Sequence, residues 1–183
     1  MATNILIAEG TYILLADTTD YPGGSQLLGT RTHQIDLTSI AASAARQSVK
    51  VDFGDPRAAT WACFAAIEFD VAPANGAVVS FHLSPSPNAT AGNANAGGAN
   101  GTDSAYTGYA GGGLANSIKQ TMLIGNLVAT ADVATVVQYQ FIGFFSPPQQ
   151  YGSIIVYNRT AQAFEGDAVE MGVLLTPLID QVQ

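Results

Sequence analysis

Apolar and polar residues alternate with a period of two most clearly over residues 60–84. Over the first half of this stretch, the apolar side of an extended strand would carry Trp61, Cys63, Ala65, Ile67, Phe69 and Val71, with Phe64 the one large apolar residue on the opposite side. After the turn signal Pro73-Ala74-Asn75-Gly76, the alternation resumes at Val79, Phe81 and Leu83. The pattern predicts a long hairpin with one buried face, and such a hairpin needs a second sheet to cover that face.

Further runs predict strands from end to end of the chain, at residues 5–8, 12–16, 49–53, 122–129, 133–145, 154–157 and 169–175, with an edge or part-exposed strand within residues 26–37. Within residues 133–145, the alternation predicts that Val137, Tyr139 and Phe141 lie in the core, with Gln138 and Gln140 on the opposite side. Residues 38–47 are the best helix candidate, because Thr38 or Ser39 can cap a helix and the alanines favour one. About nine or ten strands with little helix predict an all-β fold, an antiparallel two-sheet sandwich of jelly-roll type.

Residues 85–116 differ abruptly from the rest of the chain. They consist mostly of Gly, Ala, Asn, Ser and Thr and show no apolar periodicity. An insertion of this length usually is a flexible excursion or becomes ordered against a neighbouring chain. We expect one domain over residues 1–183 that carries this inserted loop. Its aromatic anchors Tyr106 and Tyr109 pack the loop onto the domain or onto a partner, and we predict an interface that contains Tyr106, Tyr109, Asn88, Asn100 and Asn116.

Charged residues make up only 11% of the chain, against about 25% in an average globular protein. The six Lys and Arg residues form no basic patch, and a net charge of −8 argues against nucleic acid as a partner. The apolar runs fall far short of the roughly 20 residues of a membrane-spanning helix, and the N-terminal segment lacks the features of a signal peptide. We therefore expect neither a membrane span nor export by that route. Cys63 is the single cysteine, and its place on the apolar side of a strand predicts an unreactive core residue.

No arrangement of residues in the sequence predicts an enzyme. The nucleophile elbow, the phosphate loop and the zinc motifs are absent. His33 and His82 fall on the polar sides of predicted strands, where a surface imidazole is the usual outcome. Glu68 and Asp70 form a carboxylate pair of a kind that some sandwich-fold glycosidases use, but no clear aromatic sugar platform accompanies them. The aspartates of residues 17–25 do not match a calcium loop, so we expect no catalytic residue, no cofactor and no bound metal.

Three stretches resemble small virion proteins of tailed bacteriophages, which are encoded among head and tail genes. They are AEGTYILLADTTDYPGGSQLLGTRTHQIDL near the start, residues 61–87 in the middle, and YGSIIVYNRTAQAF with DAVEMGVLLTPLID near the end. The resemblance covers most of the chain and lies in its overall pattern. It implies a capsid decoration or cement protein that binds the major capsid protein and stabilises the phage head. It also implies a homo-oligomer, a trimer or a dimer, that belongs to the virion and is assembled in the host cytoplasm.

A carbohydrate- or receptor-binding module, as in a phage tail fibre or a lectin, is the alternative, because the same fold class serves lectins. The faces of the sheets distinguish the two functions. A lectin should show aromatic and polar side chains clustered on one concave face, whereas a cement protein need not.

Overall fold

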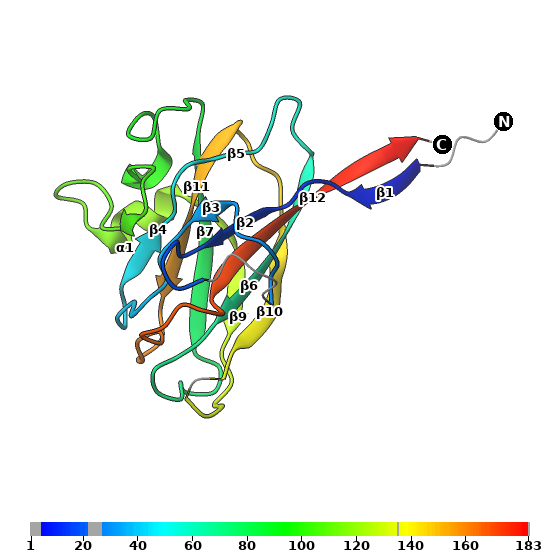
Figure 1. The fold of residues 1–183 in the computed structure, drawn as a ribbon. Helices are drawn as coiled ribbons and strands as arrows, with labels where there is room; N and C mark the ends of the chain where they lie inside the picture. The colour runs from blue at the N-terminus through cyan, green and yellow to red at the C-terminus, as the bar shows by residue number, and fades with distance from the viewer. Residues whose placement is uncertain (1–4, 22–26, 135, 183) are drawn as a thin grey trace.

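The computed structural model describes residues 5–21, 27–134 and 136–182, and it consists of two six-stranded sheets packed face to face (Figure 1). The first, called here the β6 sheet, has the order β10 (Gln138–Phe145), β6 (Thr60–Ile67), β12 (Gly172–Val182), β2 (Ile13–Ala16), β3 (His33–Gln34), with β1 (Ile5–Glu9) also paired to β12. The second, the β7 sheet, has the order β8 (Ser104–Ala105), β4 (Ala45–Gln47), β11 (Tyr151–Asn158), β7 (Val78–Ser86), β9 (Met122–Val128), with β5 (Val51–Asp52) also paired to β11. The predicted all-β sandwich is confirmed, and its strand order is consistent with a jelly roll.

Helical structure in the described residues is limited to short segments. These are α1 (Leu114–Ser117) and two 3-10 turns, at Ala96–Gly98 and Ile118–Gln120. Within the described ranges, none of these segments has the length and apolarity needed to cross a bilayer.

One apolar core fills the space between the sheets. Of the residues that the alternation over 60–84 places on the buried side, this core contains Trp61, Cys63, Ala65, Ile67, Phe69, Val79, Phe81 and Leu83, whereas Val71 is 51% exposed. Two edge-to-face ring pairs help to fix its packing, Phe53 with Trp61 at 5.2 Å between centroids and Phe69 with Phe164 at 5.5 Å. Cys63 is also buried in this core, and its burial raises the pKa of the thiol, as an unreactive structural cysteine requires.

Strands β6 and β7 do not form the predicted hairpin. β6 pairs with β10 and β12, whereas β7 pairs with β9 and β11 in the opposite sheet. Residues 68–77 therefore lead from one sheet to the other, and the apolar sides of both strands contribute to the same core. The prediction was wrong because an alternating pattern specifies which face is buried but not which strand lies beside it.

Strand β10 turns two of the side chains predicted for the core towards solvent. Tyr139 and Phe141 are each 47% exposed, whereas Gln138 is buried. A β-bulge between Phe141 and Gly143 then shifts the alternation, so that Phe145 enters the core while Phe144 faces out. The prediction of a strict alternation over residues 133–145 was therefore wrong. Val137, the third residue predicted for this core, is half-buried and packs instead on the outer face of the β6 sheet.

Residues 38–47 contain no helix; they form turns at 38–39 and 42–43 and then β4. Ser39 and Ser43 have φ angles of 50° and 60°, in the left-handed region, which a right-handed helix cannot contain. The Asn158 side-chain amide donates to the carbonyl oxygens of Ile40 at 3.0 Å and Ala41 at 3.2 Å. Tertiary hydrogen bonds of this kind satisfy the backbone and override the weak helix preference of the alanines.

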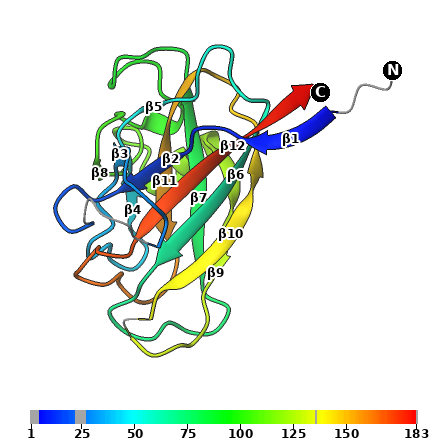
Figure 2. The ribbon, with the colours of Figure 1, turned by 45° about the vertical axis from the view of Figure 1, so that its right-hand side comes forward.

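Strand β1 and the C-terminal part of β12 extend together beyond the sandwich as a two-stranded ribbon, called here the ribbon (residues 5–9 and 178–182). Its pairing runs from Glu9 opposite Leu178 to Ile5 opposite Val182. Figures 1 and 2 both show the ribbon projecting from the body of the molecule, with the start of β1 and the end of β12 at its tip.

Candidate interaction surface

Four aromatic side chains form a continuous patch on the outer face of the β6 sheet. Phe64 comes from β6, and Tyr139, Phe141 and Phe144 come from β10. The ring of Phe64 stacks on Tyr139 at 6.0 Å and meets Phe141 at 5.2 Å, and Phe141 in turn meets Phe144 at 4.9 Å. Phe144 is the most exposed, at 61%. These four residues are called the aromatic patch below.

The register between β6 and β10 brings these rings together. Phe141 lies directly opposite Phe64, and the bulge places Phe144 opposite Ala62. The neighbouring positions in register on β6 and β12 are Ala62, Ala66, Leu174 and Thr176. None of these four register positions carries a charged side chain. The patch itself is uncharged and, apart from the Tyr139 hydroxyl, apolar.

The other half of this sheet face is covered by the chain itself. Tyr21 and Leu28, from the segment between β2 and β3, pack on Leu14 and Ala16 of β2. The Tyr21 hydroxyl donates to the carbonyl oxygen of Gly29 at 3.0 Å, which ties the segment back on itself. Since the rings on β10 stay exposed, this cover reaches only the β2 side and leaves the aromatic patch open to solvent.

The edge of the sandwich beside the patch is closed by two glutamine side chains of β10. The Gln140 amide accepts from the Val128 N–H at 3.1 Å and donates to the Val128 carbonyl oxygen at 2.8 Å. Gln138 makes the same pair of bonds with Thr130, at 2.9 Å and 3.0 Å. Each side-chain amide thus replaces the peptide group of a neighbouring strand. This arrangement explains why the glutamines, and not the aromatic rings, point between the sheets.

A groove of about 420 Å³ lies where the ribbon leaves the sandwich. Its lining is mostly apolar, from Ile7, Ala58, Ala59, Phe144, Leu178 and Ile179, and its polar atoms come from Arg57, Thr60 and Asp180. Ile7 is 71% exposed. Because Phe144 belongs to both surfaces, this groove, called the ribbon groove below, is continuous with the aromatic patch.

The inserted loop, residues 85–116, folds against the outer face of the β7 sheet. Tyr106 and Ala99 pack with Ile118 on Ala45 and Ile155 in a separate small core. The Tyr106 hydroxyl donates to the carbonyl oxygen of Gly97 at 2.5 Å, and burial raises its pKa to about 12. Of the two packing modes considered for this tyrosine, the structure has the one onto its own domain.

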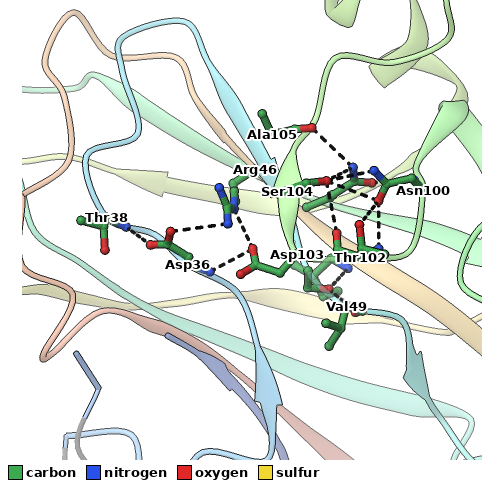
Figure 3. Close-up of polar contacts among 12 residues, drawn as sticks. Asp36, Thr38, Arg46, Val49, Asn100, Thr102, Asp103, Ser104 and Ala105 are labelled. Carbon is green, nitrogen blue, oxygen red and sulfur yellow. Dashed lines mark hydrogen bonds and ion pairs between the residues drawn. The ribbon is translucent and has the colours of Figure 1, made fainter. Parts of the chain in front are cut away.

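Side chains from β4 hold the loop by polar contacts, as Figure 3 shows. The Arg46 guanidinium donates to Asp103 at 2.6 Å and lies 3.4 Å from the Asp36 carboxylate. The Gln47 side chain accepts the N–H of Asn100 at 2.8 Å. A segment without an apolar pattern of its own is therefore ordered by partners that are distant in the sequence.

Lys50 orders the first half of the loop. Its Nζ lies 3.0 Å from Ser86 Oγ and 2.8, 2.7 and 3.1 Å from the carbonyl oxygens of Asn88, Thr90 and Asn93. An ammonium has three hydrogens for these four oxygens, so one hydrogen is shared. The ammonium group thus donates hydrogen bonds to backbone carbonyl oxygens of the loop that are not part of a β-sheet.

The predicted interface residues lie on this loop, on the sheet opposite the aromatic patch. Tyr106 is buried in the small core, whereas Tyr109, Asn88, Asn100 and Asn116 are exposed. Their contact with a partner stays a prediction. Sequence reasoning missed the aromatic patch, although Phe64 carried a signal as the one large apolar residue out of phase in its strand.

The residues considered for catalysis are not brought together. His33 lies in β3 of one sheet and His82 in β7 of the other. Burial and repulsion from Glu170, Glu165 and Asp167 raise the pKa of Glu68, which lines an acidic hollow with those carboxylates and Val169. Asp70 is exposed.

No group of three or more metal-ligating side chains suited to a metal ion occurs in the described residues. In the segment 17–25, Asp17 accepts the N–H groups of Thr19 and Asp20, both at 2.7 Å, and so caps a turn. Residues 22–25 of that segment lie outside the described ranges.

His82 is held as a neutral imidazole. The Thr121 hydroxyl donates to the carbonyl oxygen of Ile118 at 2.6 Å, so at its 3.0 Å contact with His82 it accepts the hydrogen on Nδ1. Burial, and to a lesser extent the charge of Arg159, lowers the pKa of His82 to about 4. The ring is uncharged at neutral pH and bridges β7 to Thr121, which follows the inserted loop.

Comparison of the chain with protein-family models gives no match, and comparison with curated proteins gives none either.

Proposed function

We propose that this chain is a virion structural protein, a capsid decoration or cement protein of a tailed bacteriophage that binds the major capsid protein and stabilises the head. The observation that supports a contact function best is the aromatic patch, in which three exposed rings, Tyr139, Phe141 and Phe144, are linked by ring contacts to each other or to the half-buried Phe64. Interface cores are enriched in aromatic side chains and depleted in charge, and the patch has both properties.

The geometry also favours a contact made by side chains over one made by strand addition at this edge. Gln138 and Gln140 already occupy the backbone groups of Val128 and Thr130, so a partner strand finds no free backbone groups at these two residues. A partner that covers the patch instead desolvates rings and small side chains, at little cost in lost hydrogen bonds.

The test is reconstitution on phage heads that lack this chain. Purified protein is added to such heads, and its occupancy is measured by cryo-electron microscopy and by resistance of the heads to heat. We expect regular density on the shell, and we expect the double variant Tyr139→Ser/Phe141→Ser to lose occupancy at least about tenfold. Val71→Ser changes a side chain that is 51% exposed outside the patch and is the matched control. Absence of density on the shell with the unmodified chain would overturn the proposal.

A carbohydrate- or receptor-binding module is the second candidate, because stacked exposed rings are also the platform on which sugars bind. The polar half of that signature is sparse beside the rings, because the positions in register with them on β6 and β12 are Ala62, Ala66, Leu174 and Thr176, and the charged side chains Arg57 and Asp180 lie only at the Phe144 end. Sugar hydroxyls need several hydrogen-bonding partners beside the ring, so this arrangement favours a protein partner. Binding of the unmodified chain to a glycan array, lost in Tyr139→Ser, would reverse this order.

A further inference from the structure

We propose that a second copy of this chain docks on the ribbon groove through a two-fold symmetric contact, in which the ribbon of each copy lies against the groove of the other. The inference goes beyond the proposed function, because it concerns self-association and does not depend on a capsid. Three features of the structure lead to it.

The first feature is the pairing of the strand edges. One side of the sandwich is closed by Gln138 and Gln140, and at the other side the two sheets end in β3 and β8, which have two residues each. Within the described ranges, β1 pairs only with β12, and β12 beyond Leu178 pairs only with β1. The ribbon thus presents two unpaired edges, which are templates for another chain. A two-stranded ribbon is also marginally stable alone, so it gains most from a neighbour.

The second feature is the shape of the apolar surface. Ile7 is 71% exposed on the ribbon and is itself one of the residues that line the hollow of about 420 Å³, together with Phe144 and Ile179. An exposed apolar side chain next to an apolar hollow allows two copies to pair about a two-fold axis, because each copy then offers the same side chain and the same hollow. The hollow of one copy therefore receives Ile7 of the other.

The third feature is charge. Arg57 and Asp180 line the same groove, and neither takes part in an ion pair among the described residues; Arg57 donates to the carbonyl oxygens of Pro147 and Pro148. In a two-fold contact, Arg57 of each copy faces Asp180 of the other. The chain carries a net charge of −8, so two copies repel each other at long range, and a contact with equal numbers of both signs adds no local repulsion to this. The groove meets this condition, whereas the acidic hollow around Glu68 does not.

The experiment measures the oligomeric state of the full chain by sedimentation velocity, from low concentration to about 100 µM, where a contact with a Kd near 1 µM is nearly saturated. We expect a dimer or a higher symmetric oligomer built from it. Ile7→Asp should raise the dissociation constant at least about tenfold, because it places a carboxylate in the apolar hollow. Val133→Asp, at a site 74% exposed and outside the groove, is the matched control and should associate as the unmodified chain does.

Reversing the charges of Arg57 and Asp180 tests whether these two residues face each other across the contact. Asp180→Arg and Arg57→Asp should each weaken association, and the double variant Arg57→Asp/Asp180→Arg should restore it, because the pair is reversed but still complementary. Melting temperatures of all variants establish that they are folded. If Ile7→Asp does not fold, Asp180→Arg at its exposed site decides alone.

A monomer at about 100 µM would overturn the proposal, and so would a dimer that tolerates both Ile7→Asp and Asp180→Arg. A dimer lost in Tyr139→Ser/Phe141→Ser but kept in Ile7→Asp would assign self-association to the aromatic patch instead. The outcome on phage heads is separate, since a chain that fails to decorate heads still dimerises if this inference is right.

Discussion

Phe64 and Tyr139 stack their rings 6.0 Å apart and within 15° of parallel on the solvent side of the β6 sheet. The pair belongs to neighbouring strands, and its rings meet outside the core that the same two strands help to build. Such ring pairs stabilise each other by about 0.5–1.5 kcal/mol beyond the area they bury. The contact therefore holds the aromatic patch in one arrangement before any partner arrives, which lowers the entropy that a partner must overcome.

The first prediction separates this patch from the folding core. Phe141→Ser should lower the free energy of unfolding by about 1–2 kcal/mol, because the side chain is 47% exposed and loses only its ring contacts with Phe64 and Phe144 on the sheet surface. Phe81→Ala should cost about 3–5 kcal/mol, because Phe81 is completely buried. Urea unfolding followed by tryptophan fluorescence measures both. Equal losses in the two variants would show that the patch belongs to the core and is not a free surface.

The second prediction concerns the closed edge between β9 and β10. Gln140→Ala removes two hydrogen bonds to Val128 and should cost about 1–2 kcal/mol. Hydrogen exchange should quicken at the Val128 amide, because that N–H loses its acceptor. Gln149→Ala, at an exposed position without such a bond among the described contacts, is the control and should leave exchange unchanged. An unchanged Val128 amide in Gln140→Ala would mean that β9 needs no side-chain cover.

The third prediction is a pH dependence. The pKa of His82 is about 4 in the folded chain and near 6.5 when unfolded, so the unfolded state binds more protons between these values. His82 thus contributes stability that is fully present above about pH 6.5 and is lost as the pH falls towards 4. With allowance for solvent screening, we expect a loss of about 1–2 kcal/mol.

His82→Gln removes this titration, and thermal unfolding from pH 4 to 7.5 provides the comparison. The difference in stability between the unmodified chain and the variant should shrink as the pH falls. The carboxylates titrate equally in both proteins, so their contributions cancel in the difference. If the difference does not change with pH, the pKa of His82 is the same in the folded and unfolded states and the prediction is wrong.

The fourth prediction concerns the ammonium that orders the inserted loop. Lys50→Met keeps the length of the side chain but removes all four polar contacts of Nζ. We expect destabilisation of about 1–3 kcal/mol and faster hydrogen exchange over residues 86–93. Lys119→Met removes an exposed lysine elsewhere and is the charge-matched control. If both variants behave alike, net charge and not local coordination accounts for the change.

The alternation of apolar residues was sufficient to predict the strands β6 and β7, and short apolar runs were sufficient to predict β9 and β11, because each of these strands has one face on a continuous core. It was not sufficient to predict their neighbours. Residues 68–77 pass between sheets, and the same pattern of Trp61 to Ile67 and Val79 to Leu83 would suit either a hairpin or this crossing.

The surfaces depend on contacts that a local pattern does not contain. Tyr139 turns outward because Gln138 bonds to the backbone of Thr130, just beyond the end of β9, and Phe144 faces solvent because a β-bulge shifts the alternation of β10. The order of the inserted loop likewise rests on Lys50, Gln47 and Arg46, which lie far from it in the sequence. These contacts form between segments that meet only in the fold, so neither periodicity nor composition reveals them.

The last prediction decides whether the inserted loop is a structural cover or also a contact site. Tyr106 packs in the small core against Ala45 and Ile155, so deletion of residues 91–112 uncovers that face and should destabilise the chain by several kcal/mol, about 25 cal/mol for each Å² of apolar surface exposed. A deletion alone therefore confounds folding with binding.

Tyr109 is 47% exposed and makes no side-chain hydrogen bond among the described contacts, so Tyr109→Ser should keep the melting temperature within a few degrees. If the loop contacts the shell, Tyr109→Ser should lower the occupancy of the protein on phage heads. Tyr106→Phe removes only the hydrogen bond to Gly97, so it should lower stability and leave the occupancy of the folded protein unchanged. Full occupancy of Tyr109→Ser would contradict Tyr109 as a contact residue and leave the aromatic patch as the candidate surface.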